Sequence, residues 1–204
     1  MQDSLDKRTD RPLTTRERIL VGAAAVVAER GLRGSTVQDI LKASEISRRT
    51  FYQHFPNTEG VMCDLYILKM EDLVEQVMAA AAGQEDPRRK MRAAMDAYID
   101  FQQAGGRLLI RLQTEAVRPD SMLSPIREKA LDRLVALLSG EVESLLSLHL
   151  SPMLFRSLLM GVEGLMIHLQ RKGEFPAEAA EEARAVVGAM VLDAIAGAVM
   201  RKTR

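Results

Sequence analysis

The chain has 204 residues, and 28 basic against 28 acidic side chains give it a formal net charge of zero. This balance argues against a generally polycationic protein, so any attraction for nucleic acid has to come from a local patch. Apolar residues make up 47% of the chain, which is enough for a packed core in one small domain plus one of ordinary size.

Helical periodicity runs along the chain, and no segment shows the alternation expected of a strand. Residues 1–14 are polar and charged, which predicts a flexible arm and not a signal peptide. A first helix over 15–30 stops at Gly31, a residue suited to a left-handed C-cap. After two short helices between 36 and 55, Gly and Pro positions predict helices over 59–82, 87–104, 107–117, 124–148, 152–172 and 176–201. The sequence therefore predicts an all-α fold of about nine helices.

Two short helices joined by a tight turn are predicted between residues 36 and 55. Ser35 or Thr36 can cap the first of them, since Ser35 with Gln38 has the spacing of a capping box. The apolar residues of that helix end at Leu41 and resume at Ile46, which leaves room for a turn and little else. The two helices therefore share one small core.

The second short helix separates apolar from polar side chains. Phe51 and Phe55 are four apart and mark the buried side, whereas Arg49 and Gln53 point the opposite way. Arg and Gln suit the guanine and adenine edges of the major groove. The polar residues that flank this outer face are Ser47, Arg48, Thr50, Tyr52 and His54. Such side chains commonly contact phosphate oxygens. An isolated pair of arginines is more often an ordinary solvated surface, but the capped helix before it and the aromatic pair behind it favour a DNA-reading helix-turn-helix.

Residues 15–62 resemble the amino-terminal domain of TetR-type transcriptional regulators. The shared pattern is a first helix that ends in Gly, a Thr-Val pair that opens the second helix, and spaced Ile-Ser, Thr, aromatic, Tyr and Phe residues around the third. The resemblance implies that Thr36 caps the second helix and contacts a phosphate. It also implies that four side chains face the groove, Arg48, Arg49, Thr50 and Gln53, and that Tyr52 and His54 lie near the sugar-phosphate backbone. On this basis residues 15–58 form the DNA-binding domain and residues 59–204 form a ligand-binding and dimerisation domain.

Three features depart from the family pattern. Ser44 and Glu45 stand where the family usually has Ala-Gly, and if position 45 needs a left-handed backbone, a residue other than Gly costs on the order of 1 kcal/mol. Thr58 replaces a Lys that is common just after the recognition helix, which removes one phosphate contact but leaves a cap for the next helix. Glu45 also brings a negative charge close to the predicted DNA face. The remaining basic contacts must then carry more of the affinity.

The last two long helices have the composition of helices with more than one neighbour. The first of them has a broad apolar stripe and, beside it, a stripe of small or polar residues: Ser157, Gly161, Gly164 and His168. Small and branched residues in the last helix include Val187, Val191, Ala194 and Ala198. These residues predict a four-helix homodimer interface, which the TetR resemblance also implies. A palindromic operator requires paired recognition helices about 34 Å apart. The alternative is a single-chain bundle in which both stripes are internal.

The middle helices form the effector pocket if the resemblance holds. Methionine and aromatic side chains provide deformable walls suited to an apolar ligand, and polar groups on the same helices can orient it. The residues predicted to contact the ligand are Met62, Tyr66, Met95, Tyr98, Gln102, Gln113 and Glu163. The alternative is that a methionine stripe at helical spacing is ordinary core, and that each polar residue lies at the surface or in a satisfied core pair.

Several classes of protein are disfavoured. The sequence has no phosphate-binding loop, no Gly-x-Ser-x-Gly elbow and no histidine pair at zinc spacing, so we expect neither catalysis nor a metal or cofactor. Cys63 is the single cysteine and cannot form an intrachain disulfide, which fits a reducing cytoplasm. Glu163 and Asp193 interrupt the most apolar helices, so membrane insertion is not expected.

The sequence favours a cytoplasmic, homodimeric regulator that represses by occupying a palindromic operator in double-stranded DNA. A small-molecule effector entering the helical core would release it. The alternative is a TetR-like helical interaction protein with reduced or lost operator binding, which Glu45 and the missing lysine at position 58 favour.

Overall fold

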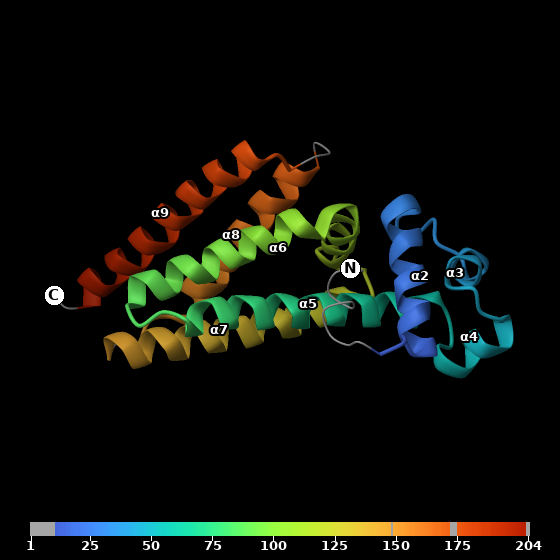
Figure 1. Cartoon of the computed structure of the whole chain (residues 1–204). Coiled ribbons are helices and arrows are strands. Elements are labelled where there is room, and N and C mark those ends of the chain that lie inside the picture. Colours follow the sequence, from blue (N-terminus) through green and yellow to red (C-terminus); the bar gives the residue numbers. More distant parts are fainter. Residues whose placement is uncertain (1–10, 148, 172–174, 203–204) are drawn as a thin grey trace. The chain divides into compact units, whose positions relative to one another are not determined.

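The structure is a computed structural model that describes residues 11–147, 149–171 and 175–202. These residues form helices and connections, with no strand among them, which confirms the all-α prediction (Figure 1). The helices are α2 (Thr15–Arg30), α3 (Val37–Ser44), α4 (Arg48–His54), α5 (Thr58–Ala82), α6 (Pro87–Ala116), α7 (Ser124–Leu146), α8 (Pro152–Gln170) and α9 (Ala177–Lys202). Most of the predicted N-terminal arm, residues 1–10, lies outside the described residues.

The described residues form eight helices where the sequence predicted about nine, because α6 joins two predicted helices. The break expected at Gly105-Gly106 is present as a kink: Gly106 has φ 52° and ψ −148°, a conformation outside the helical region. The helical segments on either side of this kink together make up α6. The position of the break was therefore predicted correctly.

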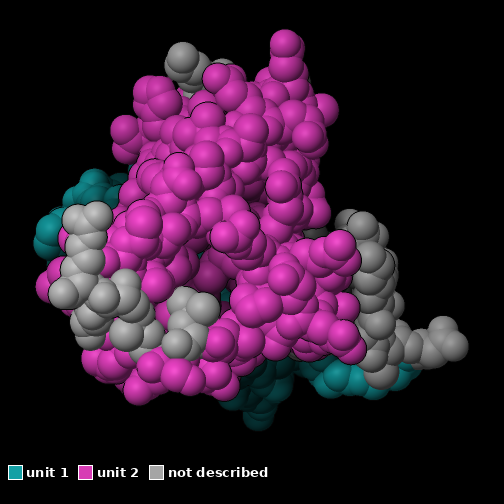
Figure 2. Space-filling model, turned by 90° about the vertical axis from the view of Figure 1, so that its left-hand side faces the viewer, with its two compact units in different colours: residues 1–72, 105–127 teal, residues 73–104, 128–204 magenta. Residues whose placement is uncertain are grey.

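The chain divides into two compact units (Figure 2). Unit 1 comprises Met1–Asp72 and Gly105–Arg127, and unit 2 comprises Leu73–Ala104 and Glu128–Arg204. Helices α5, α6 and α7 each contribute residues to both units. The division into units therefore falls within these helices, where their packing partners change. The predicted domain boundary at residue 58 lies instead at the end of the helix-turn-helix.

Unit 1 has its core where α2, α3 and α4 meet the first half of α5 and the last turns of α6. Helix α2 contributes Ile19 and Val27, and α3 contributes Ile40, all of which are fully buried. The other members include Phe51, Phe55, Val61, Met62, Leu65, Tyr66, Leu108, Leu112 and Ala116. Cys63 packs at the edge of this core, and burial raises the pKa of its thiol. Cys63 is thus a small packing residue, which is what its surroundings in the sequence indicate.

The start of α5 corrects one capping prediction. Thr58 was expected to cap this helix, but it is the first helical residue. The side chain of Asn57 occupies the cap position, and its Oδ1 accepts a hydrogen bond from the Gly60 N–H at 2.9 Å. Helix α5 therefore begins directly after the Phe55-Pro56 corner that ends α4.

Unit 2 packs the first part of α6 against α8 and α9. Its main apolar cluster includes Ile99 of α6, Met166 of α8 and Val187 of α9. Arg184 links α9 to α6, since its guanidinium donates to Asp100 Oδ1 at 2.7 Å and to the carbonyl of Asp96 at 3.2 Å. The side of α9 that carries Arg184 and Val187 therefore faces α6 and the core of unit 2.

Two helices of unit 2 are long and apolar enough to span a membrane by length and composition alone. They are α8 and the Ala177–Arg201 stretch of α9, with 28% and 17% of their most apolar window buried inside the chain. Long apolar helices of water-soluble proteins pass the same test. The low buried share nevertheless shows that much apolar surface on these helices lies uncovered in the single chain.

Candidate nucleic-acid interface

Helices α2 and α3 approach each other closely, and Gly22 makes this possible. A Cβ atom at Gly22 would lie 2.8 Å from the backbone N of Ser44 and 2.9 Å from the Ser44 Cβ. Arg18, one turn earlier on α2, donates to the carbonyls of Ser44 and Glu45 at 2.9 and 3.2 Å. The end of α3 and the following turn are therefore fixed to α2 by packing and by two hydrogen bonds.

Thr36 caps α3, as the resemblance implied, but its capping partner is Asp39. The Asp39 N–H donates to Thr36 Oγ1 and the Thr36 N–H donates to Asp39 Oδ2, both at 3.2 Å. The Thr36 hydroxyl also donates to Asp39 Oδ2 at 2.6 Å, and chiefly this hydrogen bond, with the one from the Thr36 N–H, holds the pKa of Asp39 below its ordinary value. The predicted box of Ser35 with Gln38 is wrong, because the Ser35 hydroxyl donates instead to the Gly31 carbonyl at 2.7 Å.

The turn between α3 and α4 contains a left-handed residue. Glu45 has φ 55° and ψ 43°, and its N–H donates to the carbonyl of Leu41 as the C-cap of α3. Position 45 therefore needs the left-handed backbone that the sequence analysis considered. Gly adopts this conformation without strain, whereas this chain has Glu there. Its side chain is exposed.

Helix α4 is anchored at both ends. Ser47 caps its start, since Ser47 Oγ accepts from the Thr50 N–H at 3.1 Å. Phe51 and Phe55 are 0% and 3% exposed, with ring centroids 6.1 Å apart. The guanidinium of Arg16 lies 5.1 Å from the centroid of the Phe55 ring, a cation–π contact from α2. The aromatic spacing therefore predicted the buried side of this helix correctly.

The opposite side of α4 is open to solvent. Arg49, Gln53 and His54 are exposed, and Tyr52 is 48% exposed while its ring packs edge-on against Phe51 at 5.4 Å. The remaining predicted contacts, Ser47 and Arg48, are exposed, and Thr50 is half-buried. Arg49 and Gln53 thus lie on the exposed side of α4 opposite Phe51, and we call this side the α4 outer face.

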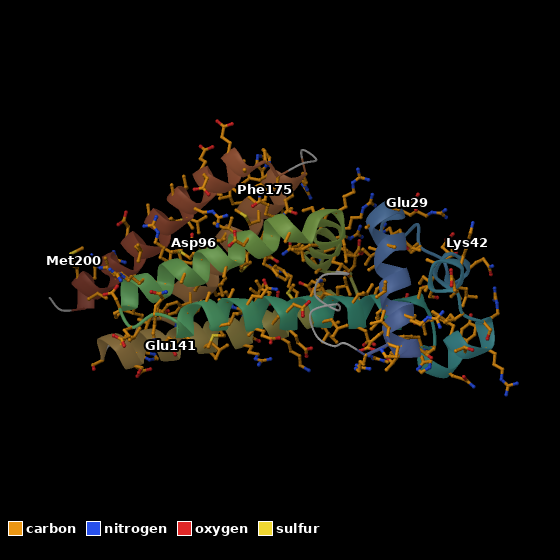
Figure 3. All side chains as sticks on the ribbon, in the orientation of Figure 1. Glu29, Lys42, Asp96, Glu141, Phe175 and Met200 are labelled. Atoms are coloured by element: carbon orange, nitrogen blue, oxygen red, sulfur yellow. The ribbon has the colours of Figure 1, made fainter. Side chains whose placement is uncertain are left out.

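Two polar residues of α3, Gln38 and Lys42, are also exposed. The Arg48 guanidinium donates to Gln38 Oε1 at 3.2 Å, so Gln38 on α3 orients Arg48. Lys42, also on α3, is exposed (Figure 3). Sequence reasoning treated Gln38 as a capping residue and gave Lys42 no role. The signal that could have identified them is their spacing of four along α3, which places both on one side of that helix.

The residues predicted to bind a ligand are not all brought together. An apolar pocket of about 110 Å³ lies within unit 2, and Met95 and Tyr98 are among its lining residues. Fully buried Gln102 lies behind them, donating to the Tyr98 hydroxyl at 2.8 Å and accepting from Gln170 Nε2 at 3.0 Å. Glu163 is half-buried on α8 but is not one of the lining residues.

The other predicted ligand contacts belong to unit 1. Met62 and Tyr66 are 2% and 1% exposed in its core, which is the alternative that the sequence had left open for them. Gln113 is also buried in unit 1, and its Oε1 has no hydrogen-bond partner within the described part of the chain. Because α5 and α6 each pass from one unit to the other, residues at their two ends pack in different cores.

Some of the residues predicted at the dimer interface are exposed, and others are buried within the chain. On α8, Ser157, Gly161, Gly164 and His168 are all exposed. On α9, Val187 and Val191 are buried in the core of unit 2, and Ala194 and Ala198 are half-buried. The prediction for Val187 and Val191 is therefore corrected, because they pack inside the chain. Val186 and Met190 occupy the outward positions, with 53% and 39% exposure.

Part of the chain matches known regulatory proteins. The model for bacterial regulatory proteins of the tetR family matches residues 19–62, which include α3 and α4. The transcriptional activator FasR of Mycolicibacterium smegmatis is 28% identical over 86 residues, which make up 42% of this chain and 39% of FasR. The chain thus matches less than half the length of that relative.

Two crystal structures share the fold across most of the chain. A transcriptional regulator from Rhodococcus sp. Rha1 has a TM-score of 0.72 at 22% identity, covering 88% of this chain and 97% of its own. Thermus thermophilus FadR, a TetR-family repressor in complex with lauroyl-CoA, has a TM-score of 0.65 at 22% identity, covering 88% and 94%. The chain thus shares the fold of these two solved regulators, and α3 and α4 lie in the part that matches the family model. Within the chain, residues 19–62 match the domain of bacterial regulatory proteins of the tetR family.

Proposed function

We propose that this protein is a homodimeric repressor that reads a palindromic operator with α4. The observation that carries the proposal is the α4 outer face: Arg49 and Gln53 stand exposed directly opposite buried Phe51 and Phe55. Arg and Gln can make bidentate hydrogen bonds to guanine and adenine edges in the major groove. Such a helix is held rigidly by its cap and aromatic anchors, so its side chains are presented in a fixed register.

Phosphate contacts position the same helix on DNA. Thr36, Ser47, Thr50, Tyr52 and His54 border the α4 outer face with groups that donate to phosphate oxygens. Arg48 on α4 donates a hydrogen bond to Gln38, and Lys42 on α3 is a second cation. These cations supply the local positive charge that a chain of zero net charge needs, and exposed Glu45 opposes it.

The uncovered faces of α8 and α9 support dimerisation. The small-residue stripe of α8 admits close approach of another helix, and the outward side of α9 carries Val186 and Met190. We infer that these faces meet the same faces of a second copy, which makes an isologous four-helix interface. Two copies present two α4 helices, and a palindromic operator offers two half-sites about one helical turn apart.

Helix α5 supports coupling between an effector and the operator. Its first half packs in the core of unit 1 through Val61, Leu65 and neighbours, and it follows α4 after the Phe55-Pro56 corner. Its second half lines the apolar pocket of unit 2 with Leu73, Val77 and Met78. A ligand that favours one position of α5 thereby shifts the pair of α4 helices, provided that it binds the released state more tightly.

Repression in the cytoplasm is the mode of action that we propose. Occupying a promoter requires only operator binding, and release by an effector then turns expression on. Thermus thermophilus FadR is a repressor, whereas FasR is an activator. Whether this protein lowers or raises transcription is therefore measured directly, once its operator has been identified.

The first experiment is a selection of genomic DNA fragments with the purified chain. We expect enrichment of one palindromic site adjacent to a promoter, with transcription from that promoter lowered by the protein in a reconstituted assay. Raised transcription would establish an activator and contradict the proposed sign. Failure to enrich any site, with weak salt-sensitive binding alone, would contradict operator recognition and favour the interaction-protein alternative.

A further inference from the structure

Helix α8 has one side that the described part of the chain leaves uncovered. Phe155, Val162 and Met166 are buried on its inner side. At about 100° per residue, the opposite side carries six residues, all of them exposed: Met153, Ser157, Met160, Gly161, Gly164 and His168. We call this side the α8 outer face. A Cβ atom at Gly161 or Gly164 would meet no described atom within 4 Å, so the face is open to a neighbouring helix. Its single titratable side chain is that of His168.

Helix α9 has a corresponding side. Ala183, Val187 and Val191 are buried. The opposite side, which we call the α9 outer face, carries the exposed residues Glu182, Val186, Ala189, Asp193, Ala196 and Met200. Asp193 thus places a carboxylate between apolar residues in the middle of this face. Neither Asp193 nor His168 has a hydrogen-bond or ion-pair partner among the described residues.

The two helices pack with matched levels. Residues 171–176 connect them, and such a short connection between packed helices makes them antiparallel. Val162 of α8 and Val187 of α9 belong to one apolar cluster and line the same pocket. Gly161 and Val186 precede these two valines in the chain and lie on the outer faces. The two residues are therefore at about the same level of the helix pair.

His168 and Asp193 lie at equal distances from that level, in opposite directions. His168 is seven residues beyond Gly161, and Asp193 is seven residues beyond Val186, which is about two helical turns in each case. A two-fold axis perpendicular to the helices at this level exchanges the two directions. It therefore brings His168 of one protomer to the level of Asp193 of the partner subunit, and the reverse.

We propose that the α8 and α9 outer faces bind the same faces of a second copy, and that His168 pairs with Asp193 of the partner subunit twice in each dimer. An imidazole N–H donates to a carboxylate in both the neutral and the protonated form. Other registers bury Asp193 against apolar side chains without a partner, which is costly. The pair therefore determines the register of the interface and its preference for a copy of this chain. The assignment rests on the homodimer proposed above.

The test measures the dissociation constant of the dimer by sedimentation equilibrium, with the full chain. His168→Glu brings a second carboxylate against Asp193, and Asp193→Lys brings a second basic group against His168. Each variant alone should raise the dissociation constant about a hundredfold, which is about tenfold for each of the two pairs. Glu85→Lys is the control, since it makes the same change in charge at an exposed residue before α6 and should leave the constant unchanged.

Mixing the two variants separates pairing from a general loss of structure. In the mixed dimer, one side keeps the native pair of His168 with Asp193, and the other joins the introduced carboxylate to the introduced lysine. We expect heterodimers at concentrations at which neither variant dimerises alone, as observed by native mass spectrometry. A misfolded variant would not recover in this way. Association that is equally weak alone and mixed would overturn the pair.

Two outcomes separate this assignment from the proposed function. A wild-type dimer whose dissociation constant neither substitution changes supports the proposed homodimer and contradicts the pair. A wild-type chain that stays monomeric, alone and with operator DNA, contradicts both the homodimer and the pair.

Discussion

Helices α4 and α9 differ in how clearly the sequence indicates which side of the helix is buried. In α4 the apolar residues Phe51 and Phe55 lie opposite Arg49 and Gln53, so burial in the structure follows the pattern directly. In α9 apolar residues run around the whole helix, and burial separates Val187 from its neighbour Val186. A surface that contrasts polar with apolar residues is predictable from sequence, whereas a helix with two apolar sides is not.

The largest expected effect comes from removing the anchor of α4. Phe51→Ala deletes a fully buried ring and should lower the free energy of unfolding by about 3–5 kcal/mol. Because α4 loses its anchor, trypsin should also cleave faster after Arg48 and Arg49 under native conditions. Phe155→Ala, which removes a 2% exposed ring from unit 2, is the matched control. Equal protection of the Arg48 and Arg49 bonds in both variants would contradict a local anchoring role.

A pair of glycine substitutions tests the contact between α2 and α3. Gly22→Ala forces a methyl group against the Ser44 backbone and should cost about 1–3 kcal/mol of unfolding free energy. Gly140→Ala places its methyl group in open space on α7 and should raise the stability by about 0.5–1 kcal/mol. Urea denaturation measures both. A stabilising Gly22→Ala would mean that α2 and α3 are not in close contact.

A smaller effect is expected at the strained turn. Glu45→Gly removes a left-handed non-glycine residue and should raise the unfolding free energy by about 1 kcal/mol. It also removes a negative charge beside the α4 outer face, so affinity for random DNA should rise most at low salt. Glu45→Gln is the control that removes the charge and keeps the strain. If Glu45→Gln stabilises the protein as much as Glu45→Gly, charge and not backbone strain is the cause.

The smallest effect concerns the cap of α3 and depends on pH. The folded-state pKa of Asp39 is lowered by the Thr36 hydrogen bonds, so the carboxylate stabilises the fold above the unfolded-state pKa, near pH 4. That contribution is lost as the pH falls through the lowered pKa. Asp39→Asn should therefore be less stable than wild type at pH 7, and the difference should shrink below about pH 4. A difference that stays constant down to pH 2 would contradict a charged cap.

The sequence predicted the recognition helix better than its surroundings for identifiable reasons. The i, i+4 aromatic pair leaves α4 one side to bury, so Arg49 and Gln53, predicted on the opposite side, are exposed. The residues alone left the cap of α3 open between Ser35 and Thr36, because Ser35–Gln38 and Thr36–Asp39 have the same spacing and suitable side chains. Backbone position, which sequence does not show, decides between them.

The ligand and dimer residues were harder to predict for a different reason. Met62 and Met95 have the same character in sequence, yet one packs in the core of unit 1 and the other lines the pocket of unit 2. Which residues of α5 and α6 face a cavity depends on where these helices pass from one unit to the other. The local sequence pattern does not indicate where α5 and α6 pass from one unit to the other.

The central claim is that α4 reads base sequence, and titration of the selected operator with wild type and Arg49→Ala tests it most directly. Arg49→Ala should lose about 1–3 kcal/mol of binding free energy for the operator and much less for random DNA. Arg133→Ala, an exposed arginine on α7, should change neither affinity. Losses for Arg49→Ala that are equal on operator and random DNA would show a phosphate contact and contradict base reading by this helix.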